Sequence, residues 1–180
     1  WLNDKNDKNV IKYLNDENNF TKKTLKNTED LQQILFDEMK SRIKEDDKSV
    51  PYFFNEYWYI KRFEKGKDYP IYSRKYKSLD NEEEILLDVN KLASKHAYYS
   101  VGSISVSPNN KILAYSFDTL SRRLYSIKFL DLKTKKKFKE TIKNTTGSIT
   151  WANDNKTIFY SKKEDKTLRV NKIYRHQLNS

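Results

Sequence analysis

Ile104-Ser-Val-Ser-Pro-Asn-Asn-Lys-Ile-Leu-Ala-Tyr-Ser116 aligns without a gap on Ile149-Thr-Trp-Ala-Asn-Asp-Asn-Lys-Thr-Ile-Phe-Tyr-Ser161, at an offset of 45 residues. The two stretches share an Asn-Lys pair in the middle and a Tyr-Ser pair at the end. In each, a strand-like run leads through an Asn-rich turn, which tolerates left-handed backbone, into a second and more apolar run. A repeat of ~40–45 residues with about four short strands is the sequence sign of a β-propeller blade.

The rest of the repeat supplies two further strands. Residues 124–132 and 138–142 read as the third and fourth strands of a complete blade, joined by a Lys-rich turn. Because equivalent strands of stacked blades face one another, the offset predicts a shared inter-blade core. Its expected members are Ile104, Leu113, Tyr115, Ile149, Trp151 and Tyr160.

Upstream of the repeat, apolar and polar residues alternate with a period of two, which is typical of half-buried strands. Residues 56–62, 69–74 and 84–88 read as strands, with a hairpin turn at Lys65-Gly66-Lys67-Asp68. The expected blades span about residues 56–90, 98–144 and 147–180. The third blade would be incomplete, and about two and a half blades are too few to close a ring, which takes about four to eight.

The first 50 residues have a helical period instead. Two apolar stripes near i, i+3 and i+4 spacing predict two amphipathic helices. The stripes consist of Val10, Ile11, Leu14, Thr21 and Leu25, and of Leu31, Ile34, Leu35, Met39 and Ile43. Thr28 reads as the N-cap of the second helix, which should end in the charged residues 44–48, ahead of Pro51. The expected fold class is mainly β, with an N-terminal helical segment (1–50) followed by the first blades of a β-propeller (51–180).

The composition is polar and basic. The chain has 36 Lys and Arg against 25 Asp and Glu, a formal net charge of +11, and its 13 Tyr, 9 Phe and 3 Trp can seed a core. With no Cys, disulfides and thiolate metal sites are excluded, and no apolar run approaches the ~20 residues of a membrane span. We therefore expect a cytoplasmic protein with no membrane partner. Its start at Trp1 suggests a processed or excised segment.

The positive charge raises the question of a nucleic-acid partner, because basic domains bind phosphate backbones. Most Lys residues are interleaved with acids, as in residues 44–48 and 162–166. The densest run, Lys133-Thr134-Lys135-Lys136-Lys137, reads as a turn between two strands. We therefore expect a solvated surface and no nucleic-acid partner; a steep salt dependence of DNA binding would contradict this expectation.

The sequence assigns no catalytic residue. Gly66, Gly102 and Gly147 are the only glycines and lie far apart, so none belongs to the Gly-x-Ser-x-Gly elbow of a serine nucleophile. His96 and His176 cannot be paired with a nucleophile, and both are expected at the surface or between strands. Gly66-Lys67 also lacks the upstream glycine of a phosphate-binding loop and reads as a turn.

The acidic clusters do not define a site either. Asp4-Lys-Asn6-Asp-Lys-Asn9 lacks the central Gly and the final Glu of a calcium loop. Glu45-Asp46-Asp47 is expected to be a solvated segment after a helix, since adjacent carboxylates rarely converge on one substrate atom. We therefore expect no catalytic residue, no cofactor and no metal in this chain.

Several segments resemble the N-terminal part of the prolyl oligopeptidase family of serine peptidases, and within it the oligopeptidase B (protease II) type. The most specific is Phe36-Asp-Glu-Met-Lys-Ser-Arg-Ile-Lys-Glu-Asp-Asp-Lys-Ser-Val-Pro51, which resembles the segment that leads into the propeller of those enzymes. Further similar segments are Trp1-Leu2, Tyr13-Leu14, Glu17-Asn18, Gly66-Lys-Asp-Tyr-Pro-Ile71, Ile85-Leu-Leu-Asp-Val-Asn90, Val106-Ser-Pro108 and Leu113-Ala-Tyr-Ser116. The resemblance covers essentially the whole chain, in order.

The resemblance implies a parent protein in which a C-terminal α/β-hydrolase domain packs on the helical segment. It further implies a seven-bladed propeller that covers the active site and admits only short peptides, which are cleaved after Lys or Arg. The triad of such enzymes lies in the later part of the chain, so no catalytic or substrate-binding residue can be carried over. We expect a structural lid and size filter, with a stand-alone propeller-type binding module as the alternative.

The unfinished third blade has a consequence for the 180-residue chain by itself. A blade buries one apolar face against each neighbour, so an uncovered face and unpaired strand backbone should promote self-association into a homo-oligomer.

Overall fold

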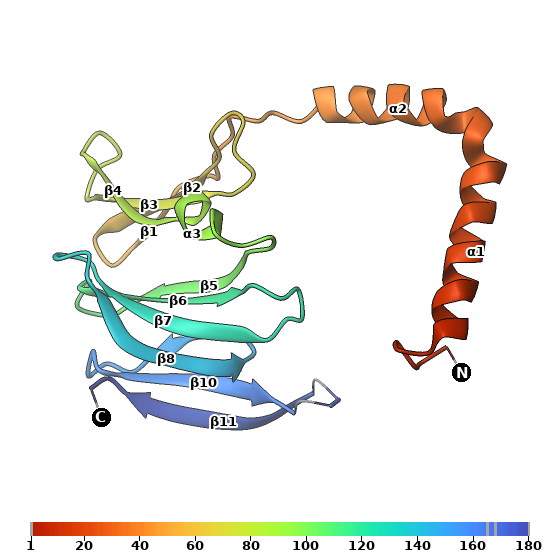
Figure 1. The fold of residues 1–180 in the computed structure, drawn as a ribbon. Helices are drawn as coiled ribbons and strands as arrows, with labels where there is room; N and C mark the ends of the chain where they lie inside the picture. Colours follow the sequence, from red (N-terminus) through yellow and green to blue (C-terminus); the bar gives the residue numbers. More distant parts are fainter. Residues whose placement is uncertain (1, 165, 168, 180) are drawn as a thin grey trace. The chain divides into compact units, whose positions relative to one another are not determined.

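The computed structural model describes residues 2–164, 166–167 and 169–179. The chain divides into two compact units, residues 1–44 and 45–180. The first unit is helical and the second consists almost entirely of antiparallel strands (Figure 1). The fold is therefore mainly β with an N-terminal helical segment, as expected.

The helical unit contains α1 (Lys8–Leu25), the short 3-10 helix η1 (Lys26–Thr28) and α2 (Glu29–Ser41). Asp7 caps α1, because its carboxylate accepts a hydrogen bond of 2.8 Å from the backbone N–H of Asn9. No helix in the described part of the chain is long and apolar enough to cross a membrane.

The expected ends of α2 need two corrections. Thr28 does precede the helix, but its hydroxyl makes no capping bond and donates instead to the carbonyl of Leu25 at 2.7 Å. This occurs because η1 continues the chain in helical backbone, so Thr28 never adopts the extended conformation of an N-cap. The helix also ends at Ser41, earlier than the expected residues 44–48. At this end, the Ser41 hydroxyl donates a hydrogen bond of 2.8 Å to the carbonyl of Glu38.

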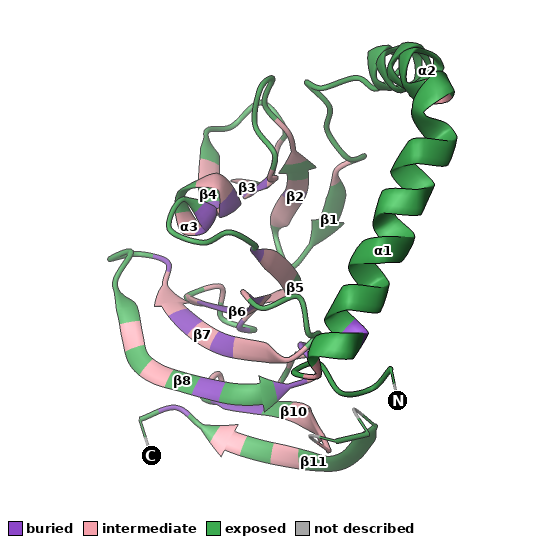
Figure 2. Cartoon of the chain, turned by 45° about the vertical axis from the view of Figure 1, so that its right-hand side comes forward, coloured by how far each residue is buried: buried purple, intermediate pink, exposed green. Residues whose placement is uncertain are grey.

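Most apolar side chains of the two helices are exposed to solvent (Figure 2). The exposed apolar residues of the two predicted stripes are Ile11, Leu14, Leu25, Leu31, Ile34, Leu35, Met39 and Ile43. Phe20 and Phe36 are exposed as well. Exposed apolar side chains gathered along helices in this way are typical of an association surface.

The first blade is a four-stranded sheet in the order β1-β2-β3-β4. Its strands are β1 (Tyr52–Phe54), β2 (Tyr57–Arg62), β3 (Ile71–Tyr76) and β4 (Glu83–Asp88), followed by α3 (Val89–Ala93). The blade begins four residues before the expected Glu56, because β1 was not expected. A two-residue turn of Asn55 and Glu56 joins it to β2, with φ of 46° and 69°, and glutamate is a poor sequence signal for left-handed backbone.

The second blade consists of β5 (Ser100–Val106), β6 (Ile112–Asp118), β7 (Tyr125–Asp131) and β8 (Lys137–Thr145), which pair in sequence order. The third blade contains β9 (Thr150–Trp151), β10 (Thr157–Lys163) and β11 (Val170–Gln177). A single pairing of Lys162 with Thr145 links β10 to β8. The strands expected at 124–132 and 138–142 correspond to β7 and β8.

The 45-residue repeat is reproduced in the turns between the first two strands of the second and third blades. Asn110 and Asn155 both have φ of 62°, and their N–H groups bond to the carbonyls of Ser107 and Ala152 at 2.8 and 3.4 Å. The blades are therefore two copies of one structural unit.

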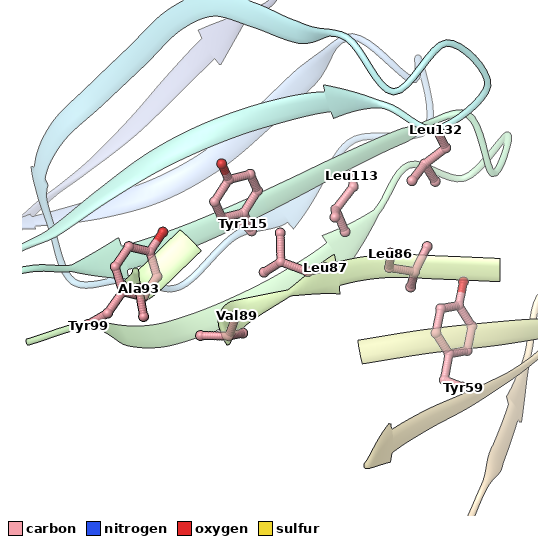
Figure 3. Close-up of a cluster of buried hydrophobic side chains, with 9 residues drawn as sticks. All are labelled: Tyr59, Leu86, Leu87, Val89, Ala93, Tyr99, Leu113, Tyr115 and Leu132. Carbon is pink, nitrogen blue, oxygen red and sulfur yellow. The ribbon is translucent and has the colours of Figure 1, made fainter. Parts of the chain in front are cut away.

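Two apolar clusters hold the three blades together. One lies between the first and second blades and is centred on Tyr59, Leu86, Leu87, Val89, Ala93, Tyr99, Leu113, Tyr115 and Leu132 (Figure 3). The other lies between the second and third and is centred on Ala114, Ile127, Phe129, Ile142, Ile158 and Leu178.

The six expected core residues are all in these clusters, but they are divided between the two. Leu113, Tyr115 and the partly buried Ile104 belong to the first cluster. Tyr160 and Ile149, the repeat equivalents of Tyr115 and Ile104, are partly buried members of the second, and so is Trp151, the equivalent of Val106. The expected single core is thus two cores, because equivalent positions of the second and third blades each face the preceding blade.

Candidate functional site: a groove between the first strands of three blades

The two histidines lie in different parts of the fold, His96 in the connection between the first two blades and His176 on the third blade. His96 follows α3 in the chain, and its ring contacts the ring of Tyr99, with 5.5 Å between their centroids. His176 on β11 stacks on Phe129 and places Nε2 3.0 Å from a carboxylate oxygen of Glu140 on β8. His176 therefore links the third blade to the second.

Other sequence motifs have local structural roles. Gly66 occupies the expected hairpin turn with φ of 72°. The Asp4 carboxylate accepts a bond of 2.9 Å from the N–H of Asn6, so this segment forms local turns. Asp47 continues the first hairpin, because its carbonyl accepts the N–H of Phe63 at 2.7 Å. Within the described residues, no group of three or more His, Asp or Glu side chains is placed to hold a metal ion.

The Lys-rich segment 133–137 is a turn between β7 and β8, as expected. The ammonium of Lys135 reaches across to the first blade, 2.8 Å from a carboxylate oxygen of Glu84. Burial favours a raised pKa for Glu84, but the hydrogen bonds and charges of Lys135 and Arg74 outweigh it and hold the pKa below its ordinary value. This Lys turn is thus a contact between blades.

Arg74 lies on β3 of the first blade and is a buried charged residue, with only 3% of its surface exposed. Its Nε donates to Glu84 at 2.7 Å and its Nη2 to the carbonyl of Asn110 at 3.1 Å. The guanidinium carbon lies 3.9 Å from the centre of the Tyr57 ring. The arginine is thereby held by an anion, a carbonyl and an aromatic face.

A groove of about 500 Å³ opens where the first strands of the three blades come together. Its lining residues are Phe54, Asn55, Ser105, Val106, Pro108, Ile149, Thr150, Trp151 and Asn153. They come from β1, β5 and β9 and from residues directly before or after those strands. None of these residues is charged, in a chain of which 34% is charged.

Trp151 fixes one wall of this groove. Its indole N–H donates to the carbonyl of Ser105 on the second blade at 3.0 Å, and its ring meets Phe129 edge-on at 6.2 Å between centroids. Phe54, which also lines the groove, is 64% exposed. Apolar walls with a few amide and hydroxyl groups are the usual lining of a site for a small ligand or an extended peptide.

Sequence reasoning missed this groove. Phe54 and Asn55 belong to a strand and turn that were not expected, and Arg74 was read only as part of a strand. The sequence did show the asparagines Asn109-Asn110 at the edge of the groove, and they were correctly predicted to form a turn. The contacts that these residues make across blades depend on the tertiary structure.

Sheets of antiparallel strands that stack face to face and bring their first strands to one groove define the class of this protein: a β-propeller, here represented by three blades. Residues 1–180 match the family model for the prolyl oligopeptidase N-terminal β-propeller domain. The chain belongs to this family, whose members are serine peptidases, and it covers the N-terminal propeller part.

Individual relatives agree with this assignment. The chain is 36% identical to a dipeptidyl aminopeptidase BI of Pseudoxanthomonas mexicana and 29% identical to protease 2 of Moraxella lacunata, covering 100% of this chain and 27% of each relative. Oligopeptidase B from Leishmania major is 32% identical and superimposes with a TM-score of 0.89, over 100% of this chain and 26% of that one. The resemblance to oligopeptidase B is thus confirmed, and the chain spans about a quarter of the length of these relatives.

Proposed function

We propose that this chain is the N-terminal portion of an oligopeptidase B-like serine endopeptidase that cleaves short peptides after Lys or Arg. In that protein the blades act as a structural lid and a size filter. The observation that carries the proposal is the convergence of β1, β5 and β9 on one groove, because the first strands of propeller blades surround the central passage.

The physical basis of the filter is exclusion. A folded protein cannot pass its chain through a narrow passage between blades, whereas a short peptide can. The two apolar clusters and the Arg74 contacts make the blades a stiff wall, since close-packed interiors deform little.

The proposed partners are the C-terminal hydrolase domain and the remaining blades of the same protein. The exposed apolar side chains of α1 and α2 offer a surface for the hydrolase domain. On the third blade, Phe159 and Ile173 are exposed at positions equivalent to the buried Ala114 and Ile127, which hold the third blade on the second. A fourth blade of the same kind would cover them.

The test uses the full-length protein and fluorogenic peptides with Arg, Lys or Pro before the cleaved bond, each in a series of increasing length. We expect hydrolysis after Arg and Lys, a loss of rate with length, and inhibition by a serine-directed reagent. Equal rates for short peptides and for an unfolded protein chain would overturn the filter. An absence of any hydrolysis would favour the stand-alone binding module.

A second candidate activity is the release of dipeptides from peptide N-termini. It is favoured by the 36% identity to the dipeptidyl aminopeptidase BI. Substrates with a free N-terminus and their N-acetylated counterparts separate the two activities, because an aminopeptidase requires the free amine and an endopeptidase does not. The cytoplasmic location stays a prediction, which cell fractionation with an antibody against the protein would test.

A further inference from the structure

The turn after the first strand of every blade contains an asparagine in left-handed backbone. Asn55, Asn110 and Asn155 have φ of 46°, 62° and 62°. Glycine adopts this conformation at no steric cost, and asparagine is among the few other residues that tolerate it. The three positions therefore pose a question that backbone geometry alone does not answer, namely why none of them is glycine.

The side chains of these asparagines bond to the neighbouring blade. Asn55 Nδ2 donates to the carbonyl of Pro108 at 2.7 Å, and Asn110 Nδ2 donates to the carbonyl of Asn55 at 3.1 Å. The Oδ1 of Asn155 accepts the backbone N–H of Asn109 at 2.7 Å. Glycine could form the turns but none of these three bonds.

The bonds lie at the rim of the groove. Asn55 and Pro108 line it directly, and so does Asn153, whose carbonyl accepts the Nδ2 of Asn155 at 3.3 Å. The apolar clusters join the faces of the sheets, whereas these amides join the turns at their ends. Asn110 is held a second time, because its carbonyl accepts from the buried Arg74.

We propose that Asn55, Asn110 and Asn155 form an asparagine clasp that fixes the groove rim of the first three blades as one rigid body. Opening at this rim then requires breaking two clasp bonds between the first and second blades, or one clasp bond between the second and third, in addition to the bonds of Arg74 and Trp151. Resting on the proposed function, the clasp keeps this part of the filter at constant width, so that any widening of the passage takes place between other blades.

Substitution by glycine tests the clasp, because it permits the left-handed backbone and removes the side-chain bonds, which for Asn155 are the bond to the N–H of Asn109 and the local bond to the carbonyl of Asn153. In Asn155→Gly the N–H of Asn109 loses its acceptor, and its hydrogen exchange should become about fivefold faster, the factor expected for one hydrogen bond. Asn144→Gly is the matched control. Asn144 has φ of 58°, is exposed, and its side chain makes no hydrogen bond to the described residues.

Exchange is measured by NMR on the full-length protein, with the amide of Leu113 in the first apolar cluster as an internal standard for global stability. Faster exchange of the Asn109 amide in Asn155→Gly, with Leu113 unchanged, supports the clasp. Unchanged exchange at Asn109, or the same increase in Asn144→Gly, overturns it. A global increase that includes Leu113 would show that the asparagine acts on folding rather than on the rim, and would also overturn it.

The consequence for the filter has its own readout. Asn110→Gly should raise the kcat/KM of long peptides relative to short ones, and Asn144→Gly should not. An unchanged length preference with faster rim exchange would leave the clasp in place and overturn its role in size selection. A wild-type protein without hydrolytic activity would overturn the proposed function, while the exchange result would still decide the clasp.

Discussion

The hydroxyl of Ser116 donates a hydrogen bond of 2.7 Å to the carbonyl oxygen of Gly147, which lies 31 residues further along the chain. Both residues are buried, and the same hydroxyl accepts the backbone N–H of Ser103 at 2.9 Å. The ring of Tyr125 fills the space beside Gly102 and Gly147. The connection from the second blade to the third is therefore packed against the second blade at Gly147, where no room is left for a side chain.

Gly147→Ala should lower the free energy of unfolding by ~3 kcal/mol, the combined effect of backbone strain and overpacking. A Cβ at this position would lie 2.9 Å from the Tyr125 ring, and φ is +93°. Gly66→Ala is the control, because its φ is +72° but no atom lies within 4 Å of the added Cβ. It should cost only ~1 kcal/mol in a urea melt, and equal losses in the two variants would show that Tyr125 moves aside freely.

Arg74→Met should lower the free energy of unfolding by ~2–4 kcal/mol. The change leaves Glu84 without one of its cations and the carbonyl of Asn110 without the donor that the buried Arg74 supplies. Arg62→Met removes an arginine that pairs with Glu64 and Glu83 nearer the solvent, and it should cost below ~1 kcal/mol. The order of the two losses in denaturant melts is the decisive observation.

Stability should fall in acid partly through Glu84. Its pKa is lowered in the folded protein, so the carboxylate stabilises the fold above the unfolded pKa of about 4.3, and this contribution is lost as the pH falls through the folded pKa. Glu84→Gln should therefore show a shallower loss of stability between about pH 5 and pH 3 than the wild type. Glu82→Gln, at an exposed position, should follow the wild-type profile; parallel profiles for all three proteins would refute the assignment.

Trp151→Ala should lower the free energy of unfolding by ~3 kcal/mol, since a large ring is removed from the contact between the second and third blades. Trp151→Phe retains the ring contact but removes the hydrogen bond to the carbonyl of Ser105, for a loss of ~1 kcal/mol. Leu120→Ala, at a residue 74% exposed, is the control and should be neutral. A loss under ~1 kcal/mol for Trp151→Ala would show that the ring contributes little to this contact.

The 180-residue chain should self-associate through the open face of the third blade. Ile173 is 80% exposed there, beside the exposed Phe159 and Val170. Burial stabilises association by ~25 cal/mol per Å² of apolar surface, while salt screens charges beyond ~8 Å. Sedimentation in ~100 mM salt should show a dimer or larger species.

Ile173→Lys should shift that equilibrium towards the monomer, and Leu120→Lys, which adds the same charge away from this face, should not. A strictly monomeric wild-type chain at high concentration would contradict the prediction.

The sequence predicted the repeating part of the fold well, because a 45-residue offset places residues such as Leu113 and Ile158 at equivalent points of successive blades. Local signals were less reliable. Thr28 is a residue type that favours N-caps, but it does not adopt the backbone conformation of one. The turn at Asn55-Glu56 has the backbone conformation of a hairpin turn but lacks the glycine usual there. The groove and the inter-blade bonds were out of reach, since they join residues about 46 to 55 positions apart.

The absence of charge among the residues that line the groove has a consequence for the order in which a peptide would be selected. The net charge of +11 acts over the whole surface and alters how often charged peptides arrive, an effect that depends on ionic strength. Walls of amides, hydroxyls and apolar side chains cannot distinguish a cationic peptide from a neutral one of the same width. The groove of these three blades would then select by shape without regard to charge, after net charge has acted on arrival. A preference for Lys or Arg would have to be imposed later, where the peptide meets other parts of the protein.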